Sequence, residues 1–364
     1  MARNYNYNFL TQQSLIFVFL SILLFGACRE RKDIDESYFT TRGLVLSVED
    51  LSTLDWPTKA KEAGLTTIAT HVTPSQVAAF IQSPNGQAFL QQCKDLGLEV
   101  EHELHAMNDL LPRDLFTEDS TMFRMNEEGR RVADFNLCVH SERALATASD
   151  NALKYAAILK PTTGRYFYWI DDAKPMCHCD RCSQYSDSEQ ALILENRLIK
   201  ELKTIDPHAT LAHLAYINTM IAPEKIKPEP GIFLEFAPIQ RSWKTSLADT
   251  AMHVERRDYL SATQTHGDLL KLLDDNLKVF GKENAQVLEY WLDVSQFSNW
   301  KRPAVKLPWN KDVFVKDMDV YAKRGIRNVT TFAVYVDSAY VNTYGDTRFV
   351  QEYGEGLRGF RLRE

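Results

Sequence analysis

The segment with the most reactive side chains runs from residue 166 to residue 182. It begins with the apolar stretch Tyr166-Phe-Tyr-Trp-Ile and continues directly into Asp171 and Asp172. Carboxyls at the end of a buried strand suit acid–base chemistry, because the neighbouring Trp169 can desolvate one of them and raise its pKa. We therefore predict that Asp172, or its neighbour Asp171, is a catalytic general acid.

Three cysteines with Cys-x-Cys-x-x-Cys spacing follow this strand: Cys177, Cys179 and Cys182. Three thiolates at this spacing can surround one tetrahedral metal ion, and a fourth ligand closes a structural zinc site. Cys138 is the favoured fourth ligand, because the loops after strands three and four of a barrel are neighbours. His208 has suitable spacing, but a predicted helix over residues 188–205, about 27 Å long, carries it away; His178 is a weaker candidate.

Disulfides are the alternative for the same cysteines. The chain is expected to be exported, as argued below, and an oxidising compartment permits Cys138 to pair with one of the three. Zinc and disulfides both stay open at this point. Cys93 lies in a predicted amphipathic helix and is interpreted as a small core residue.

Two further carboxyls lie within apolar strands. Glu235 stands in Phe-Leu-Glu-Phe and Glu289 in Val-Leu-Glu-Tyr-Trp. A charge in such a strand is costly unless it is paired or lines a cavity. We predict that one of them is the nucleophile or base that complements Asp171 or Asp172.

Polar and aromatic side chains near other predicted strand ends form a candidate substrate site. They are His71, His105, Trp169, Tyr216, Asn218, Trp291, Tyr335 and Asp337. Aromatic rings and hydroxyl-binding groups together suit sugars. His71, His105 and Asp172 also permit a different hypothesis, a metal-dependent hydrolase, provided that the three side chains converge.

Eight apolar, β-branched runs alternate with segments of helical spacing. The runs are residues 43–47, 66–72, 98–104, 165–171, 210–216, 232–238, 287–293 and 328–337. The helical segments are residues 75–96, 141–159, 188–205, 267–280 and 311–324. Such alternation is typical of a parallel barrel with helices outside.

We therefore predict a (β/α)8 barrel of the TIM type, with long loops and the functional residues at the carboxyl ends of the strands. The connection over residues 217–231 is rich in proline and has room for only a short helix. For that reason an open doubly wound sheet is the alternative.

The first residues predict export. An apolar run over residues 15–25 precedes Gly26, Ala27 and Cys28, which resembles a lipobox although Phe25 replaces the usual leucine. A membrane-spanning helix needs about 20 apolar residues, so we interpret residues 1–27 as a signal peptide. An ordinary secretory signal with a chance cysteine is the alternative.

The mature chain is then expected to consist of a charged tether over residues 28–38 and a single barrel domain over residues 39–364. A lipid on Cys28 would anchor it to a bilayer in the cell envelope, on the periplasmic side of the outer membrane or at the cell surface. The lipid bilayer is thus one predicted partner.

Charge and motifs exclude several classes of function. The chain has 42 basic and 49 acidic residues, a net charge of −7, and no basic stripe that would indicate a nucleic-acid partner. It has no Gly-x-Ser-x-Gly elbow, no P-loop and no Gly-x-Gly-x-x-Gly fingerprint, so esterase, kinase and dinucleotide-dependent activities have little support.

The chain resembles a carbohydrate-associated family of bacterial proteins, known mainly as a domain of unknown function and distantly similar to α-glucuronidase and hexosaminidase barrels. The resemblance covers roughly residues 130–360. It rests on Asn136-Leu-Cys-Val-His-Ser-Glu142, on Asp172 with the three cysteines, on Ala215-Tyr216 and on Leu307-Pro-Trp309. It implies a barrel of glycoside-hydrolase type with an acid after the fourth strand, at Asp171 or Asp172.

The leading hypothesis is a glycoside hydrolase that acts on an extracytoplasmic oligo- or polysaccharide through paired carboxyls. It needs no cofactor for catalysis, and zinc would serve structure only. A non-catalytic glycan-binding lipoprotein is the first alternative and the metal-dependent hydrolase the second.

Overall fold

The computed structural model describes Met1 and residues 37–255 and 263–362. The chain divides into two units, Met1–Glu36 and Ser37–Glu364, and the second contains the fold. The predicted signal peptide, Cys28 and most of the predicted tether lie outside the described residues, so they remain predictions. Within the described ranges, no helix is long and apolar enough to cross a membrane.

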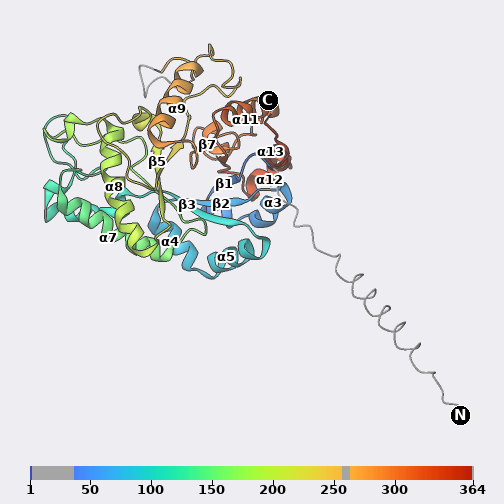
Figure 1. Ribbon diagram of the computed structural model, residues 1–364, viewed down its shortest axis with the longest axis horizontal. Coiled ribbons are helices and arrows are strands. Elements are labelled where there is room, and N and C mark those ends of the chain that lie inside the picture. The colour runs from blue at the N-terminus through green and yellow to red at the C-terminus, as the bar shows by residue number, and fades with distance from the viewer. Residues whose placement is uncertain (2–36, 256–262, 363–364) are drawn as a thin grey trace. The chain divides into compact units, whose positions relative to one another are not determined.

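Eight parallel strands close into a barrel in chain order, and β8 pairs with β1. In Figure 1, β1, β2 and β3 lie beside one another. The strands are β1 Thr41–Ser47, β2 Thr67–Val72, β3 Glu99–His105, β4 Arg165–Trp169, β5 Thr210–Ala215, β6 Ile232–Phe236, β7 Gln286–Glu289 and β8 Asn328–Phe332. Each predicted run overlaps one strand, and the predicted barrel is confirmed. Because every strand has two neighbours, the open-sheet alternative is wrong.

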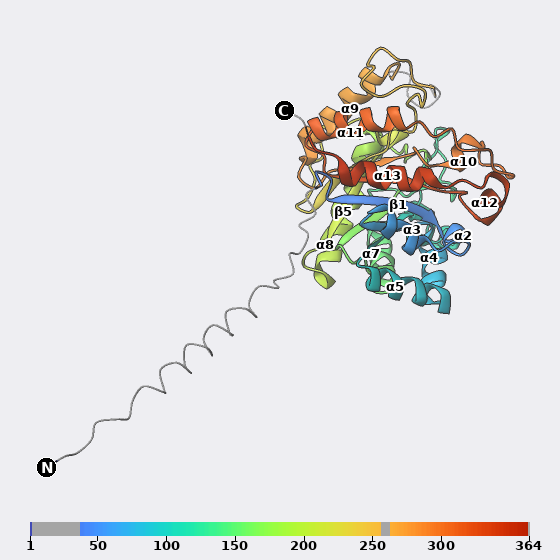
Figure 2. The ribbon, with the colours of Figure 1, turned by 90° about the vertical axis from the view of Figure 1, so that its right-hand side faces the viewer.

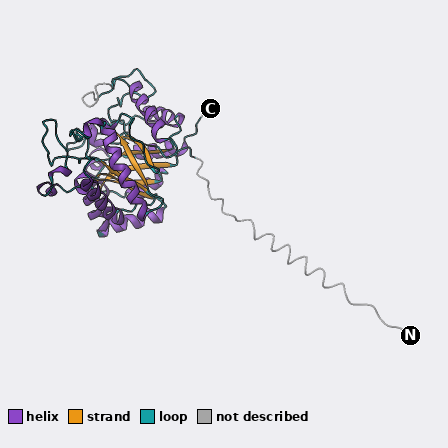
Figure 3. Cartoon of the chain, turned by 60° about the vertical axis from the view of Figure 1, so that its left-hand side comes forward, coloured by secondary structure: helices purple, strands orange, loops and turns teal. Residues whose placement is uncertain are grey.

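Helices surround the strands (Figure 3). They are α2 Val48–Leu51, α3 Trp56–Ala63, α4 Pro74–Gln82, α5 Pro84–Leu96, α6 Met107–Leu110, α7 Glu142–Ile158, α8 Asp187–Ile205, α9 His266–Phe280, α10 Val294–Phe297, α11 Lys311–Lys323, α12 Ser338–Tyr344 and α13 Arg348–Gly359. In Figure 2, α13 lies beside α11, and it also packs on α3. Gly354 permits the close approach, because a Cβ there would lie 2.4 Å from the carbonyl oxygen of Ala63.

One helix prediction needs correction. The single helix predicted over residues 75–96 is two helices, α4 and α5, separated at Ser83. Ser83 has extended backbone angles, and its side chain accepts a hydrogen bond from the N–H of Gly86. The break follows from Pro84, because a proline disfavours helical angles in the residue before it and is well accommodated at the first position of a helix.

Some connections at the carboxyl ends of the strands are long and carry little regular structure. Between β3 and α7 they include only the short α6 and two 3-10 turns. After β5 the described chain forms a single 3-10 turn, Ile217–Thr219, in place of a full helix. These loops are long enough to build a site above the barrel.

Successive strand side chains point alternately into the barrel and toward the helices. On β7, Val287 belongs to the outer core and Leu288 to the cluster inside the barrel. On β6, Leu234 belongs to the outer core and Phe233 to the inner cluster. This alternation decides which of the predicted carboxyls can reach a site at the barrel mouth.

Candidate active site

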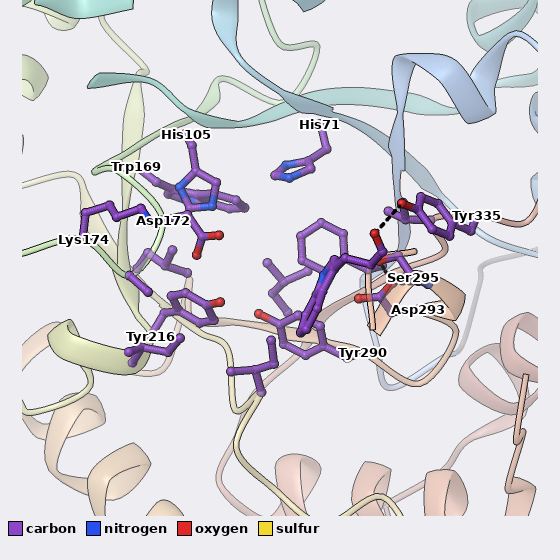
Figure 4. A pocket seen from close by; sticks show the side chains of 18 residues that line it. His71, His105, Trp169, Asp172, Lys174, Tyr216, Tyr290, Asp293, Ser295 and Tyr335 are labelled. Carbon is purple, nitrogen blue, oxygen red and sulfur yellow. Dashed lines mark hydrogen bonds between the residues drawn. The ribbon is translucent and has the colours of Figure 1, made fainter. Parts of the chain in front are cut away.

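A pocket of about 500 Å³ lies at the carboxyl ends of the strands (Figure 4). Sites for small ligands are typically about 300–1,000 Å³. Its polar and aromatic lining comes from residues at or after the ends of β2, β3, β4, β5, β7 and β8: His71, His105, Trp169, Asp172, Lys174, Tyr216, Tyr290, Asp293, Ser295, Trp300, Phe332 and Tyr335. Side chains distant in the sequence therefore meet at the mouth of the barrel.

Two histidines and a tryptophan form one wall of the pocket. Nδ1 of His71 lies 2.7 Å from the carbonyl oxygen of Glu103, and Nδ1 of His105 lies 2.8 Å from that of Ile170. A carbonyl oxygen can only accept, so each Nδ1 carries a hydrogen, and Nε2 is an acceptor when the ring is neutral. Burial lowers the pKa of His71 to about 4. Both rings pack on Trp169.

The two aspartates after β4 have different surroundings. Asp171 accepts hydrogen bonds from Arg113 Nη2 at 2.9 Å and from the backbone N–H of Asn136 at 2.6 Å, and it does not line the pocket. Asp172 is exposed and lines the pocket. Ala173 follows with a left-handed φ of 50°, a backbone conformation often found at functional sites. The anchored Asp171 thus positions Asp172.

A second carboxyl, that of Asp293, enters the pocket from the loop after β7. Its Oδ1 caps α10, accepting from the N–H of Ser295 at 3.0 Å, the hydroxyl of Ser295 at 2.6 Å and the N–H of Gln296 at 3.3 Å. Burial raises the pKa of Asp293 to about 6, the hydrogen bonds from Ser295 acting in the opposite direction. Figure 4 shows Asp172 and Asp293 on different sides of the pocket.

Aromatic side chains complete the lining. Tyr216 and Tyr290 present hydroxyls, and burial raises the pKa of Tyr290 well above its usual value, so this phenol can donate a hydrogen bond. Trp300 is 48% exposed. Tyr335 has a left-handed φ of 69°, and its backbone N–H donates to the carboxylate of Asp50 at 3.2 Å. These rings offer both stacking surface and hydroxyl partners for a ligand.

The structure brings six predicted site residues together in the pocket: His71, His105, Trp169, Asp172, Tyr216 and Tyr335. It places six others outside the pocket lining: Asp171, Asn218, Glu235, Glu289, Trp291 and Asp337. Alternation along the strands and long-range pairing account for these positions.

Glu289 and Trp291 face the helices. Arg241 Nη1 donates to Glu289 Oε1 at 2.9 Å and to Asp317 Oδ2 at 2.6 Å. The hydroxyl of Tyr321 also donates to Glu289, and Trp291 Nε1 donates to Asp317 at 3.1 Å. All of these groups are buried. Glu289 therefore belongs to an ion-pair network between β7 and α11.

Glu235 faces the inside of the barrel below the pocket. Its carboxylate accepts from Trp169 Nε1 at 2.8 Å and from Gln286 Nε2 at 2.9 Å. Burial raises its pKa to about 8. Glu235 thus supports the indole that forms part of the pocket wall and does not itself line the pocket.

Asn218 and Asp337 support loops near the pocket. The Asn218 amide donates to Asp187 at 2.8 Å and to the carbonyl oxygen of Lys174 at 3.2 Å. Asp337 pairs with Arg302 and caps α12 through the N–H of Tyr340 at 2.8 Å. Both side chains hold the backbone around the site.

Sequence reasoning missed the other residues that line the pocket, among them Lys174, Tyr290, Asp293, Ser295 and Trp300. A local signal existed for one of them, because Asp293 precedes Ser295 by two residues after a strand, a common helix-capping pattern. The predicted seventh strand extended to residue 293, whereas β7 ends at Glu289. The later residues therefore lie outside the strand, with Asp293 at the N-cap of α10 and Ser295 within that helix.

The structure also brings the four predicted cysteine ligands together: Cys138, Cys177, Cys179 and Cys182. In the described part of the chain, this is the one group of three or more His, Cys, Asp or Glu side chains close enough to hold a metal ion. His71, His105 and Asp172 do not form such a group, so the described residues provide no metal site for the hypothesis of a metal-dependent hydrolase.

Comparison with known families places this chain in one of them. The domain of unknown function DUF4838 matches residues 30–267. The chain belongs to this family. No curated protein matches it in sequence.

A solved structure of a glycoside hydrolase shares the fold, and others are similar to this chain. A β-N-acetylhexosaminidase from Bacteroides fragilis NCTC 9343 aligns over 87% of this chain with a TM-score of 0.52 and 9% identity. The alignment covers 65% of that enzyme, so the chain spans less than two thirds of its length. A glycoside hydrolase family 20 β-N-acetylglucosaminidase aligns over 88% of this chain and 70% of its own, with a TM-score of 0.48 and 9% identity.

Proposed function

We propose that this DUF4838 chain is a glycoside hydrolase that cleaves an O-glycosyl bond with Asp172 and Asp293. One observation carries the proposal: two carboxyls in different surroundings line one pocket at the carboxyl ends of the barrel strands. Glycosidic cleavage uses one protonated and one ionised carboxyl on the two sides of the bond. The barrel fold shared with the Bacteroides hexosaminidase supports this class of reaction.

Asp293 suits the role of general acid. Burial raises its pKa to about 6, so about half of these carboxyls carry a proton at that pH, far more than for an ordinary aspartate. In the reaction it would donate its proton to the glycosidic oxygen as the bond to the leaving group breaks. The backbone N–H groups of Ser295 and Gln296 keep the carboxyl in place.

Asp172 suits the role of nucleophile or base. It is exposed to solvent at the pocket, and the second carboxyl of such a pair acts in its ionised form. It would attack the anomeric carbon or take a proton from an attacking water. Asp172 thus stays in the proposed catalytic pair, but as nucleophile or base in place of the general acid that the sequence predicted, and Asp293 takes the place of Glu235 and Glu289 as its partner.

The remaining lining would bind the sugar. Nε2 of His71 and of His105 can accept hydrogen bonds from hydroxyl groups, while Tyr216 and Tyr290 can donate. Trp169 and Trp300 offer aromatic faces, to which the apolar face of a sugar ring packs.

The test compares the hydrolysis of a panel of aryl glycosides and glycans, N-acetylhexosaminides included, by the wild-type protein and by the variants Asp172→Asn and Asp293→Asn. Loss of a positioned acid or base should lower kcat by about 10²–10⁴-fold. Asparagine retains the capping acceptor of Asp293, so unfolding is not the expected cause of the loss. Turnover by both variants within about twofold of the wild-type rate would refute the assignment.

Asp55→Asn is the matched control. Asp55 caps α3 through the N–H of Thr58 and does not line the pocket, so its variant should keep full activity. Sugar affinity of the wild-type protein without any hydrolysis would favour the glycan-binding alternative. The proposed site of action outside the cytoplasm rests on the predicted lipobox at Cys28, and turnover of a membrane-impermeant substrate by intact cells tests it.

A further inference from the structure

Four buried cysteines converge from two neighbouring loops, away from the proposed catalytic carboxyls. Cys138 lies in the loop between β3 and α7, and the other three lie in the loop between β4 and α8: Cys177, Cys179 and Cys182. Their four sulfur atoms all lie within 4.8 Å of one another. Cys138 Sγ is 3.8 Å from Cys179 Sγ and 3.8 Å from Cys182 Sγ.

The two 3.8 Å separations match the geometry of a tetrahedral thiolate site, and the other sulfur atoms lie near enough to complete it. With zinc–sulfur bonds of about 2.3 Å, the edges of a regular tetrahedron are about 3.8 Å long. A disulfide instead requires its two sulfur atoms to lie about 2.05 Å apart and joins them in pairs. We propose that the four cysteines bind one zinc ion, as a structural site separate from catalysis.

The surroundings of the sulfur atoms suit a negatively charged metal–thiolate centre. Four thiolates with one divalent ion carry a net charge of about −2. The backbone N–H of Met125 donates to Cys177 Sγ at 3.3 Å, and Arg131 Nη1 lies 3.6 Å from the same sulfur. Such donors to ligand atoms orient the ligands and offset their charge.

A buried glutamine fixes the loop that holds three of the ligands. Gln190 on α8 accepts from the N–H of Cys177 at 3.2 Å and donates to the carbonyl oxygens of Cys177 at 3.2 Å and Cys182 at 3.3 Å. The loop is therefore held in shape by an element outside it. This preorganisation is typical of a structural metal site, in which the supporting contacts set the orientation of the ligands.

The histidines near these cysteines in the sequence are not needed as ligands. His178 Nε2 lies 3.4 Å from the carboxylate of Glu127 and is partly exposed. His208 lies just before β5, at the amino end of that strand, whereas the cysteine loops are at the carboxyl ends of their strands. The site is thus complete with four thiolates.

The zinc ion would join the loop between β3 and α7 to the loop between β4 and α8, and residues of the second loop line the pocket. Asn136, two residues before Cys138, donates to the carbonyl oxygens of Lys174 and Pro175 and bonds with Asp171. Asp172 and Lys174 lie on the other loop, five and three residues before Cys177. The ion therefore positions the backbone that carries Asp172 without touching the reacting atoms.

The experiment measures metal by mass spectrometry on the whole protein, purified without added metal, for wild type, Cys138→Ser and Cys93→Ala. We expect about one zinc per chain in wild type and in Cys93→Ala, which removes a buried cysteine from α5 outside the cluster. Cys138→Ser should lose the ion to a chelator that leaves wild type loaded.

Measurements on wild type alone keep the proposal testable if Cys138→Ser fails to fold. After removal of zinc, titration with Co²⁺ should produce thiolate charge-transfer absorption, and the cluster thiols should react with a thiol reagent only in the metal-free protein. Protein without metal whose intact mass shows disulfides would overturn the proposal, as would metal-free thiols that give no cobalt absorption. Neither readout uses glycosidase activity, so the outcome is independent of the proposed function.

Discussion

At the scale of single residues, environment separates side chains that look equivalent in the sequence. Asp171 and Asp172 are adjacent, yet one is tied to Arg113 and the other lines the pocket. Asp293 is buried and accepts a hydrogen bond from the hydroxyl of Ser295, whereas Asp172 is exposed. A pair of carboxyls with contrasting surroundings is what acid–base cleavage of a glycoside needs.

The pH dependence of the reaction tests the role of Asp293. A general acid must be protonated, so kcat/KM should fall about tenfold per pH unit as the pH rises beyond about 6, the raised pKa of Asp293. The Ser295 hydroxyl stabilises the charged form of this carboxyl, so Ser295→Ala should raise the pKa of Asp293. The alkaline limb of the kcat/KM profile should then move to a higher pH by about 0.5–1 unit. The measurement is kcat/KM of both proteins from pH 4 to about 9. An alkaline limb that stays in place or moves to a lower pH in Ser295→Ala contradicts the role of Asp293 as general acid.

At the scale of elements, the two-residue alternation along β7 decides which side chains can reach the pocket. Leu288 and Tyr290 face the barrel interior, and Glu289 faces α11. The sequence prediction placed Glu289 in the site because a charge within an apolar strand must be paired or line a cavity. The structure shows the paired case, with Arg241 as its partner.

Glu289→Gln distinguishes these two cases. The variant retains an oxygen acceptor but loses the charge facing Arg241, so the free energy of unfolding should fall by about 1–3 kcal/mol. The kcat should stay within about twofold of the wild-type value, because Glu289 does not line the pocket. Urea unfolding and steady-state kinetics on one preparation provide both quantities, and a hundredfold loss of kcat with unchanged stability would place Glu289 in the reaction.

At the scale of the whole molecule, the barrel interior holds more acidic than basic groups. Glu101, Glu103 and Glu235 lie there with Arg165, which is 3.3 Å from Glu101. Burial and the neighbouring carboxylates raise the pKa of Glu103 well above its ordinary value. The barrel that supports the pocket is therefore most stable when part of this cluster is protonated.

Glu103→Gln tests this interpretation. Because the folded-state pKa of Glu103 lies above the unfolded value, the stability that this group contributes is present at low pH and is lost as the pH rises through the folded pKa. Glutamine has no proton to lose, so the variant should gain stability relative to wild type with rising pH, by about 1–3 kcal/mol at the alkaline end. Denaturant midpoints between pH 5 and about 9 measure the difference in stability between the variant and wild type. Glu99→Gln, at an exposed position on the same strand, is the control. A stability difference that does not change with pH would contradict the prediction.

The fold could be predicted from the sequence because its signals are local. Each apolar, β-branched run overlaps one barrel strand, and the alternation of runs with helical segments is that of a parallel barrel. The position of Asp172 directly after a strand and the spacing of the three cysteines are local signals too.

Only the tertiary structure decided which carboxyls share the pocket. β7 ends four residues earlier than its apolar pattern suggests, so Asp293 lies beyond the strand, at the N-cap of α10. The alternation along β7 places Glu289 on the helix side. The partner that neutralises Glu289 is Arg241, which is 48 residues away. Strand ends and long-range ion pairs depend on contacts between distant segments, and local sequence does not encode them.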